Sequence, residues 1–106
     1  MQNERLQTLL DLDSSEKPDV TTKYMLALEY LRLEDTSCET YFETLLNDFE
    51  EYLPTYYIAG EYYYNKEEYQ KSMNILEKGL LVAEKAGNTK TYNEIKNLLL
   101  NVEMES

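Results

Sequence analysis

The sequence predicts an all-α protein of about six short antiparallel helices, and three observations support this fold class. The 106 residues include only three Gly and two Pro, too few for an all-β chain, which needs a turn about every 8 to 12 residues. Apolar side chains recur with helical spacing along most of the chain. Short polar or proline-containing breaks separate these stretches, which indicates tight turns between antiparallel neighbours.

The first two helices follow from their leucines and from the polar break between them. Leucines within residues 6–10 predict a short helix that ends in the polar stretch 13–19. Asp19 can accept hydrogen bonds from the free amides of a second helix. The apolar positions of this helix continue to Leu33, so we expect it to end near Glu34.

A third helix is expected after Thr36. Thr36 and Glu39 have the spacing of a capping box, in which each side chain accepts from the other residue's free amide. Apolar side chains then recur with helical spacing as far as Phe49. Pro54 ends this pattern, because proline lacks the amide needed for continuation but suits the first turn of the next helix.

The last three helices are separated by two short polar breaks. The fourth carries its apolar side chains within residues 56–63. Asn65 stands three residues before Glu68, so we expect Asn65 to cap the fifth helix. Gly87 suits a left-handed stop to that helix, and Asn88 suits the cap of a sixth.

Helices two and three span about 34 residues, and helices four and five span the same length, so the chain contains two copies of a helix-turn-helix unit. Glycine in the middle of a helix costs roughly 0.5 to 1 kcal/mol, so the glycines of the second copy need a packing reason. Close approach of two helices supplies that reason. In this copy the small side chains stand at Gly60, Ser72 and Gly79. The bulky ones between them stand at Tyr56, Tyr63, Tyr69 and Leu76.

This pattern resembles the tetratricopeptide repeat, in which small residues let two antiparallel helices approach beneath large ones. The first copy resembles it too, with one residue deleted in the turn around Asp35-Thr36 and with Leu45 departing from the small residue expected there. The residues that fit in this copy are Leu26, Ala27, Tyr30, Cys38 and Phe42.

The resemblance implies a single domain, residues 1–106, with the right-handed α-α superhelix of that family. Its parts would be an N-terminal capping helix and loop (1–18), two repeats (19–52 and 53–86) and a C-terminal capping helix (87–106). The last helix would take the place of a third repeat's first helix, which supplies the neighbour that a repeat needs to bury its face.

The resemblance also implies a non-catalytic protein-interaction module that binds a peptide segment in a concave groove. The groove is lined by the first helix of each repeat, and an aromatic stripe beside a carboxylate suits peptide binding. The implied partner-binding residues are Tyr57, Glu61, Tyr64 and Asn65 in the second repeat and Tyr24, Leu28 and Arg32 in the first, with Thr55 and Leu31 at two further groove positions. An open alternative is that the sixth helix covers these rings.

The charge and composition of the chain limit the classes of partner that it can bind. The net charge is −11, which disfavours nucleic-acid phosphates and anionic membranes. Residues 1–65 hold 14 acidic and 4 basic side chains, so we expect a basic protein or peptide partner, with solubility alone as the simpler reading of the charge. Cys38 cannot form an internal disulfide and no signal sequence opens the chain, so we expect a cytoplasmic location.

The residues of catalytic chemistry are missing. Histidine is absent, and no phosphate loop or nucleophile elbow is present, so we expect no enzyme, no cofactor and no metal. Residues 11–16 resemble a calcium loop, but the segment that starts at Asp11 lacks the Gly of the sixth position and the Glu of the twelfth, where Thr22 stands. The alternative function is a homo-oligomeric assembly unit that uses exposed Tyr and Leu side chains, and the expected state is a monomer or a weak homo-oligomer.

Overall fold

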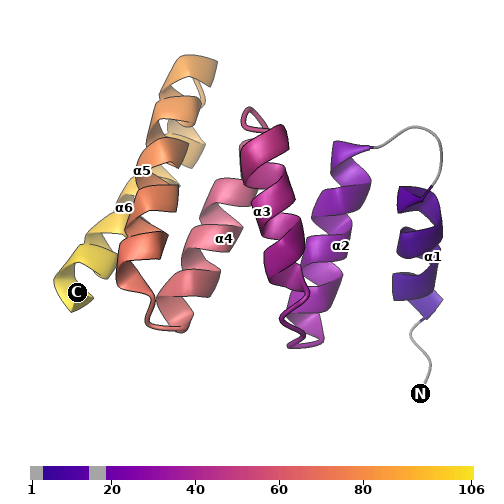
Figure 1. Ribbon diagram of the computed structural model, residues 1–106. Coiled ribbons are helices and arrows are strands. Elements are labelled where there is room, and N and C mark those ends of the chain that lie inside the picture. Colours follow the sequence, from indigo (N-terminus) through magenta and orange to yellow (C-terminus); the bar gives the residue numbers. More distant parts are fainter. Residues whose placement is uncertain (1–3, 15–18) are drawn as a thin grey trace. The chain divides into compact units, whose positions relative to one another are not determined.

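The computed structural model describes residues 4–14 and 19–106, and all regular structure in these ranges is helical (Figure 1). The prediction of an all-α fold is confirmed. The helices in chain order are α1 (Glu4–Asp13), α2 (Val20–Arg32), α3 (Cys38–Asp48), α4 (Pro54–Asn65), α5 (Tyr69–Ala86) and α6 (Thr89–Glu105).

The helices form two compact units, Met1–Tyr52 and Leu53–Ser106. In the first unit α2 packs against both α1 and α3, and in the second α5 packs against both α4 and α6, which also contact each other. The division falls where the second repeat was expected to begin. The single domain 1–106 and its four parts stay a prediction.

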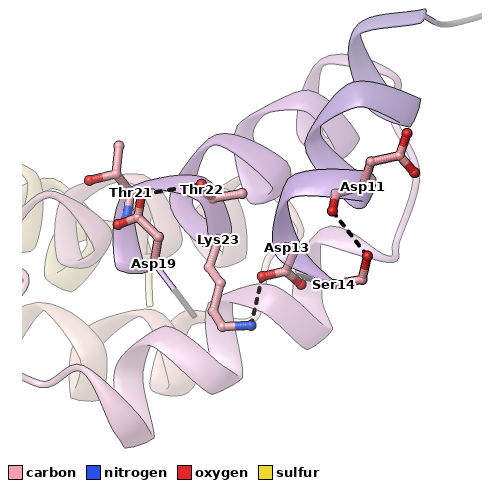
Figure 2. Close-up of polar contacts among 7 residues, drawn as sticks. All are labelled: Asp11, Asp13, Ser14, Asp19, Thr21, Thr22 and Lys23. Carbon is pink, nitrogen blue, oxygen red and sulfur yellow. Dashed lines mark hydrogen bonds and ion pairs between the residues drawn. The ribbon is translucent and has the colours of Figure 1, made fainter. Parts of the chain in front are cut away.

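Asp19 begins α2 as expected. Its carboxylate accepts from the Thr21 amide at 3.1 Å and from the Thr22 hydroxyl at 3.3 Å. Figure 2 shows the neighbouring tie between the first two helices, where Lys23 Nζ of α2 lies 2.9 Å from Asp13 Oδ1 of α1. Both charged side chains are more than four-fifths buried, so this ion pair joins the helices across the loop that connects them.

Two of the predicted capping residues are wrong. The residue before α3 is Ser37, which makes no side-chain cap bond, and the Asp35 carboxylate accepts from the Ser37 amide at 2.8 Å. This backbone hydrogen bond also lowers the pKa of Asp35. Asn65 is the last residue of α4 and does not cap α5, which begins after Glu68 without a side-chain cap.

Three helices end in the same left-handed turn. The turn residues are Glu34, Glu67 and Gly87, with φ of 57°, 62° and 70°. In each turn this residue donates to the carbonyl three residues back, and the next residue donates to the carbonyl five residues back, all at 2.9 or 3.0 Å. These two bonds are those of the Schellman motif, whose left-handed residue is usually glycine. Only the stop at Gly87 was predicted.

The deletion expected in the first copy lies directly after its left-handed turn. The buried Cys38 lies four positions after Glu34, whereas the buried Ser72 lies five positions after Glu67. The amides of residues 38–40 bond to carbonyls three residues back, at 3.1, 2.9 and 3.2 Å. The first copy therefore has tight turns at the position where, in the second copy, the first turn of α5 is found.

The second unit is packed around its small residues. A Cβ atom added to Gly60 would stand 2.7 Å from Leu76 Cγ, and one added to Gly79 would stand 2.7 Å from Tyr56 Cβ. Real Cβ atoms do not approach carbon so closely, so only glycine lets α4 and α5 cross here. Ser72 Oγ donates to the Gly60 carbonyl oxygen at 2.7 Å in the same crossing. The predicted packing of the second copy is confirmed.

The first unit buries four of the five side chains on which its weaker resemblance rests, and the fifth, Tyr30, is half-buried. Leu26, Ala27 and Phe42 are fully buried, and Cys38 is a buried free thiol. Leu45 is fully buried too, although it is larger than the residue expected there. Among the described residues no helix is long and apolar enough to cross a bilayer.

Candidate protein-interaction surface

Three predicted binding residues form a stripe on α4. Tyr57, Glu61 and Tyr64 recur at helical spacing, so they share one side of the helix, and all three are half-buried. Asn65 at the helix end is exposed. The helix α6 packs beside α4 but leaves these side chains partly accessible. We call Tyr57, Glu61 and Tyr64 the α4 stripe.

The sixth helix contributes charge to one end of the α4 stripe. Partial burial raises the pKa of the Tyr57 phenol, and the carboxylates of Glu61 and Glu94 raise it further, since a nearby negative charge disfavours the phenolate. Glu94 lies on α6 and is exposed. An accessible ring at this end therefore stands beside two carboxylates from different helices.

The other end of the stripe holds a pair of rings. Tyr64 and Tyr69 have centroids 6.0 Å apart with planes tilted by 49°, and both are half-buried. Partial burial raises the pKa of the Tyr69 phenol, as do the charges of Glu67 and Glu105. Carboxylates from the turn after α4 and from the end of α6 thus act on the Tyr69 ring of this pair.

The rings of two further tyrosines of α4 are in contact with lysine ammonium groups of the same unit. Lys66 Nζ lies 5.3 Å from the Tyr62 ring centroid, and Lys71 Nζ lies 4.4 Å from that of Tyr63. The rings of Tyr62 and Tyr63 also meet edge to face, with centroids 4.9 Å apart. These separations are typical of cation–π contacts.

In the first unit the structure brings together Leu28 and Arg32. They line an open hollow of about 290 Å³ with Arg5, Met25 and Glu29. The Glu29 side chain is only 4% exposed and holds both guanidinium groups, with Arg5 Nε at 3.1 Å and Arg32 Nη2 at 2.5 Å. Sequence reasoning missed Arg5 and Glu29. The spacing of Glu29 and Arg32 on one helix side was the available signal.

Tyr24, the third predicted residue of the first unit, does not line this hollow. Its ring meets Tyr52 edge to face, with centroids 5.3 Å apart. Partial burial raises the pKa of the Tyr24 phenol, with a smaller contribution from Tyr52. Tyr24 is half-buried and serves at least in part to hold the segment after α3.

Thr55 is not a surface residue, which corrects the expectation that it lines the groove. It is 0% exposed, and its Oγ1 has no hydrogen-bond partner among the described residues. Leu31, at the other additional groove position, is half-buried.

Two other hollows hold none of the predicted binding residues. One of about 630 Å³ is lined by the end of α3, the segment after it and Val20, and the other, of about 340 Å³, surrounds Gly87. In the described ranges no three residues of the metal-binding types lie together. In the calcium-loop-like segment, Asp11 accepts from Gln7 at 3.0 Å and Asp13 pairs with Lys23; Glu16 lies outside the described residues.

The fold is similar to that of a tetratricopeptide repeat domain protein from Salinibacter ruber. The chain in its crystal structure has 27% sequence identity to this one, and the two superpose with a TM-score of 0.78. The match covers 83% of this chain and 100% of that chain. A solution structure of the same target gives 26% identity and a TM-score of 0.80, and this match covers 87% of this chain and 94% of that chain. No protein-family model matches the sequence, and no curated protein matches it.

These likenesses extend over most of both chains, and they agree with the close helix crossings at Gly60 and Gly79. The expected resemblance is confirmed: the chain has a tetratricopeptide-repeat-like fold.

Proposed function

We propose that the protein is a non-catalytic interaction module that binds a peptide segment of a partner protein on the α4 stripe and Asn65. The observation that carries this proposal is the partial exposure of Tyr57, Glu61 and Tyr64 on one side of a helix whose opposite side is fixed in the core. The tetratricopeptide-repeat-like fold supports a protein as the partner.

The chemistry of the stripe favours a peptide. Tyrosine rings offer a large contact area with few rotatable bonds, so little entropy is lost when a ligand packs on them. Glu61 can accept hydrogen bonds from a peptide amide or pair with a basic side chain. In the first unit we propose Leu28, Arg32 and the exposed part of Tyr24 as a separate contact surface for a partner.

The net charge points to the kind of partner. With an excess of carboxylates, the chain attracts basic proteins and repels nucleic acid and anionic lipid. We propose a basic peptide for this reason, in a protein that acts in the cytoplasm as a monomer or weak homo-oligomer.

The test is selection of peptides from a random displayed library on the immobilised chain, followed by affinity measurements on variants. We expect Tyr57→Ala and Tyr64→Ala to weaken the selected peptides at least about tenfold, a loss typical of a central tyrosine anchor. Helical circular dichroism should remain unchanged, because both side chains are half-buried on the surface.

Tyr62→Ala is the matched control. Tyr62 lies on the same helix but off the stripe, where it carries Lys66, so its removal should leave peptide affinity within about twofold. Equal affinity of the selected peptides for the Tyr57→Ala, Tyr64→Ala and wild-type chains would contradict the proposed site.

A homo-oligomeric assembly unit is the second candidate. Leu100 and Met104 of α6 are 47% and 84% exposed, and Leu81 of α5 is 66% exposed. Light scattering at high concentration separates the two functions. A stable oligomer that Leu100→Ser and Met104→Ser dissolve would favour assembly, whereas a monomer would disfavour it.

A further inference from the structure

We propose that the Tyr64–Tyr69 ring pair, flanked by the carboxylates of Glu67 and Glu105, is the place where the partner segment inserts a lysine or arginine side chain. This inference rests on the proposed function and adds the chemical class of the recognised residue. It concerns the second unit alone, in which α4, the turn after it, α5 and α6 each supply one of the four groups.

The rings provide the first half of the site. Their centroids are 6.0 Å apart and the planes are tilted by 49°, so the rings contact each other at an angle and are not stacked face to face. Both rings are half-buried, and therefore each has an accessible portion. The face of a tyrosine ring carries negative potential and attracts ammonium and guanidinium groups.

Carboxylates provide the second half. Glu67 and Glu105 are exposed and lie near enough for their charges to act on the Tyr69 phenol. A cation placed against the exposed parts of the two rings would be attracted by both carboxylates as well as by the rings. An anionic or uncharged side chain at the same place would lack the electrostatic part of this attraction.

The same unit already shows how the rings of α4 bind cations. Lys66 and Lys71 occupy the rings of Tyr62 and Tyr63, whereas among the described residues no lysine or arginine stands over Tyr64 or Tyr69. Tyr64, at the end of the α4 stripe, and Tyr69 of α5 therefore remain open to a cation from a partner.

The experiment is a titration of the isotope-labelled full chain with N-acetyl-lysine methylamide, followed by backbone amide chemical shifts. The uncharged control ligand is N-acetyl-norleucine methylamide, which keeps the aliphatic stem. We expect saturable shifts around Tyr64, Glu67, Tyr69 and Glu105 with the lysine compound, and much smaller shifts with the norleucine compound.

Variants separate the two halves of the site. Glu67→Gln and Glu105→Gln should each weaken the lysine compound about two- to fivefold, and Tyr69→Leu should weaken it by a similar factor. Tyr69→Phe keeps a ring and should restore binding. Glu34→Gln is the matched control, because Glu34 holds the same turn position in the first unit, and it should change nothing.

Two results would overturn the inference. One is an equal response to the norleucine compound. The other is a lysine response that Tyr69→Leu and Glu67→Gln leave unchanged, which would mean diffuse attraction to the acidic surface. Failure here is distinguishable from failure of the proposed function: peptides that depend on Tyr57 and Tyr64 but need no basic residue and tolerate Tyr69→Leu would uphold the function and reject this inference.

Discussion

Thr55 and Ser72 are both buried hydroxyl residues of the second unit, but only Ser72 has a partner, the Gly60 carbonyl. A buried polar atom without a hydrogen bond costs about 1 to 3 kcal/mol. We therefore expect Thr55→Val, which keeps the shape, to raise the free energy of unfolding by about 1 kcal/mol. Ser72→Ala should lower it by about 1 kcal/mol. Denaturant unfolding followed by circular dichroism measures both, and a destabilising Thr55→Val would show that its hydroxyl is satisfied.

Gly60 tests the helix crossing directly. Any side chain there would overlap Leu76, so we expect Gly60→Leu to destabilise the protein by about 1 to 3 kcal/mol through overpacking. Glu77→Leu places the same side chain at an exposed position of α5 and should change stability by no more than about 0.5 kcal/mol. Equal effects of the two substitutions in denaturant unfolding would argue against the close approach.

At the same scale, residues explain what the sequence could and could not predict. Gly60, Ser72 and Gly79 gave the register of the second copy, because only small side chains fit where two helices cross. Thr55 was misplaced, since repeat position alone does not show that its hydroxyl is enclosed. The burial of Glu29 was also missed, because it depends on Arg5, a residue from another helix whose docking no local pattern reveals.

Among the elements, the turns carry more strain than the helices. A residue other than glycine in the left-handed region costs roughly 1 to 2 kcal/mol, and Glu34 and Glu67 both adopt it. The sequence offers no glycine at either place, so the turns themselves were not anticipated. The capping predictions at Thr36 and Asn65 failed for a related reason. The Schellman bonds fix the backbone direction at the end of α2 and of α4, and this direction determines where the next helix begins.

Replacement of either strained glutamate by glycine should stabilise the protein. We expect Glu34→Gly and Glu67→Gly each to add about 0.5 to 1 kcal/mol to the free energy of unfolding, because relief of strain exceeds the entropy that glycine adds to the unfolded chain. The same change inside a helix, Glu77→Gly in α5, should remove about 1 kcal/mol. Stability measurements that place all three variants on the destabilised side would contradict the role of the turn.

For the molecule as a whole, alkaline pH should be the destabilising condition. Tyr24, Tyr41, Tyr57 and Tyr69 have pKa values raised above the ordinary 10.0, mainly by burial. A raised pKa in the folded state gives stability that is present below about pH 10 and lost as pH rises through the folded value, because the unfolded chain releases these protons first. Each of the two units contributes two of these four phenols.

Denaturant unfolding between about pH 8 and pH 11 measures this loss. We expect stability to fall above about pH 10 as tyrosinate absorbance appears on unfolding. Tyr57→Phe with Tyr69→Phe should make the fall shallower, and Tyr24→Phe with Tyr41→Phe should do the same. An unchanged pH profile in both pairs would assign the loss to other groups, such as the lysines.

The all-helical fold was predictable from the repeat, but the interaction surface was predictable only in part. The spacing of Tyr57, Glu61 and Tyr64 placed them correctly on one side of α4. The contribution of Glu94 and Glu105 could not be foreseen, because these residues stand far along the chain and come near Tyr57 of α4 and Tyr69 of α5 only after α6 has packed. The same holds for the hollow around Leu28, which needs α1 to be in place.

The first helix has one well-buried side chain, Leu9, and is tied to α2 by ion pairs near both its ends, Arg5 with Glu29 and Asp13 with Lys23. Ion pairs contribute less than apolar burial when salt is present. Within the first unit, α1 should therefore detach transiently while α2 and α3 stay folded, and its amide hydrogens should exchange with deuterium soonest, more so as salt is added. The helix that completes the Leu28 hollow would then also be the one that opens it.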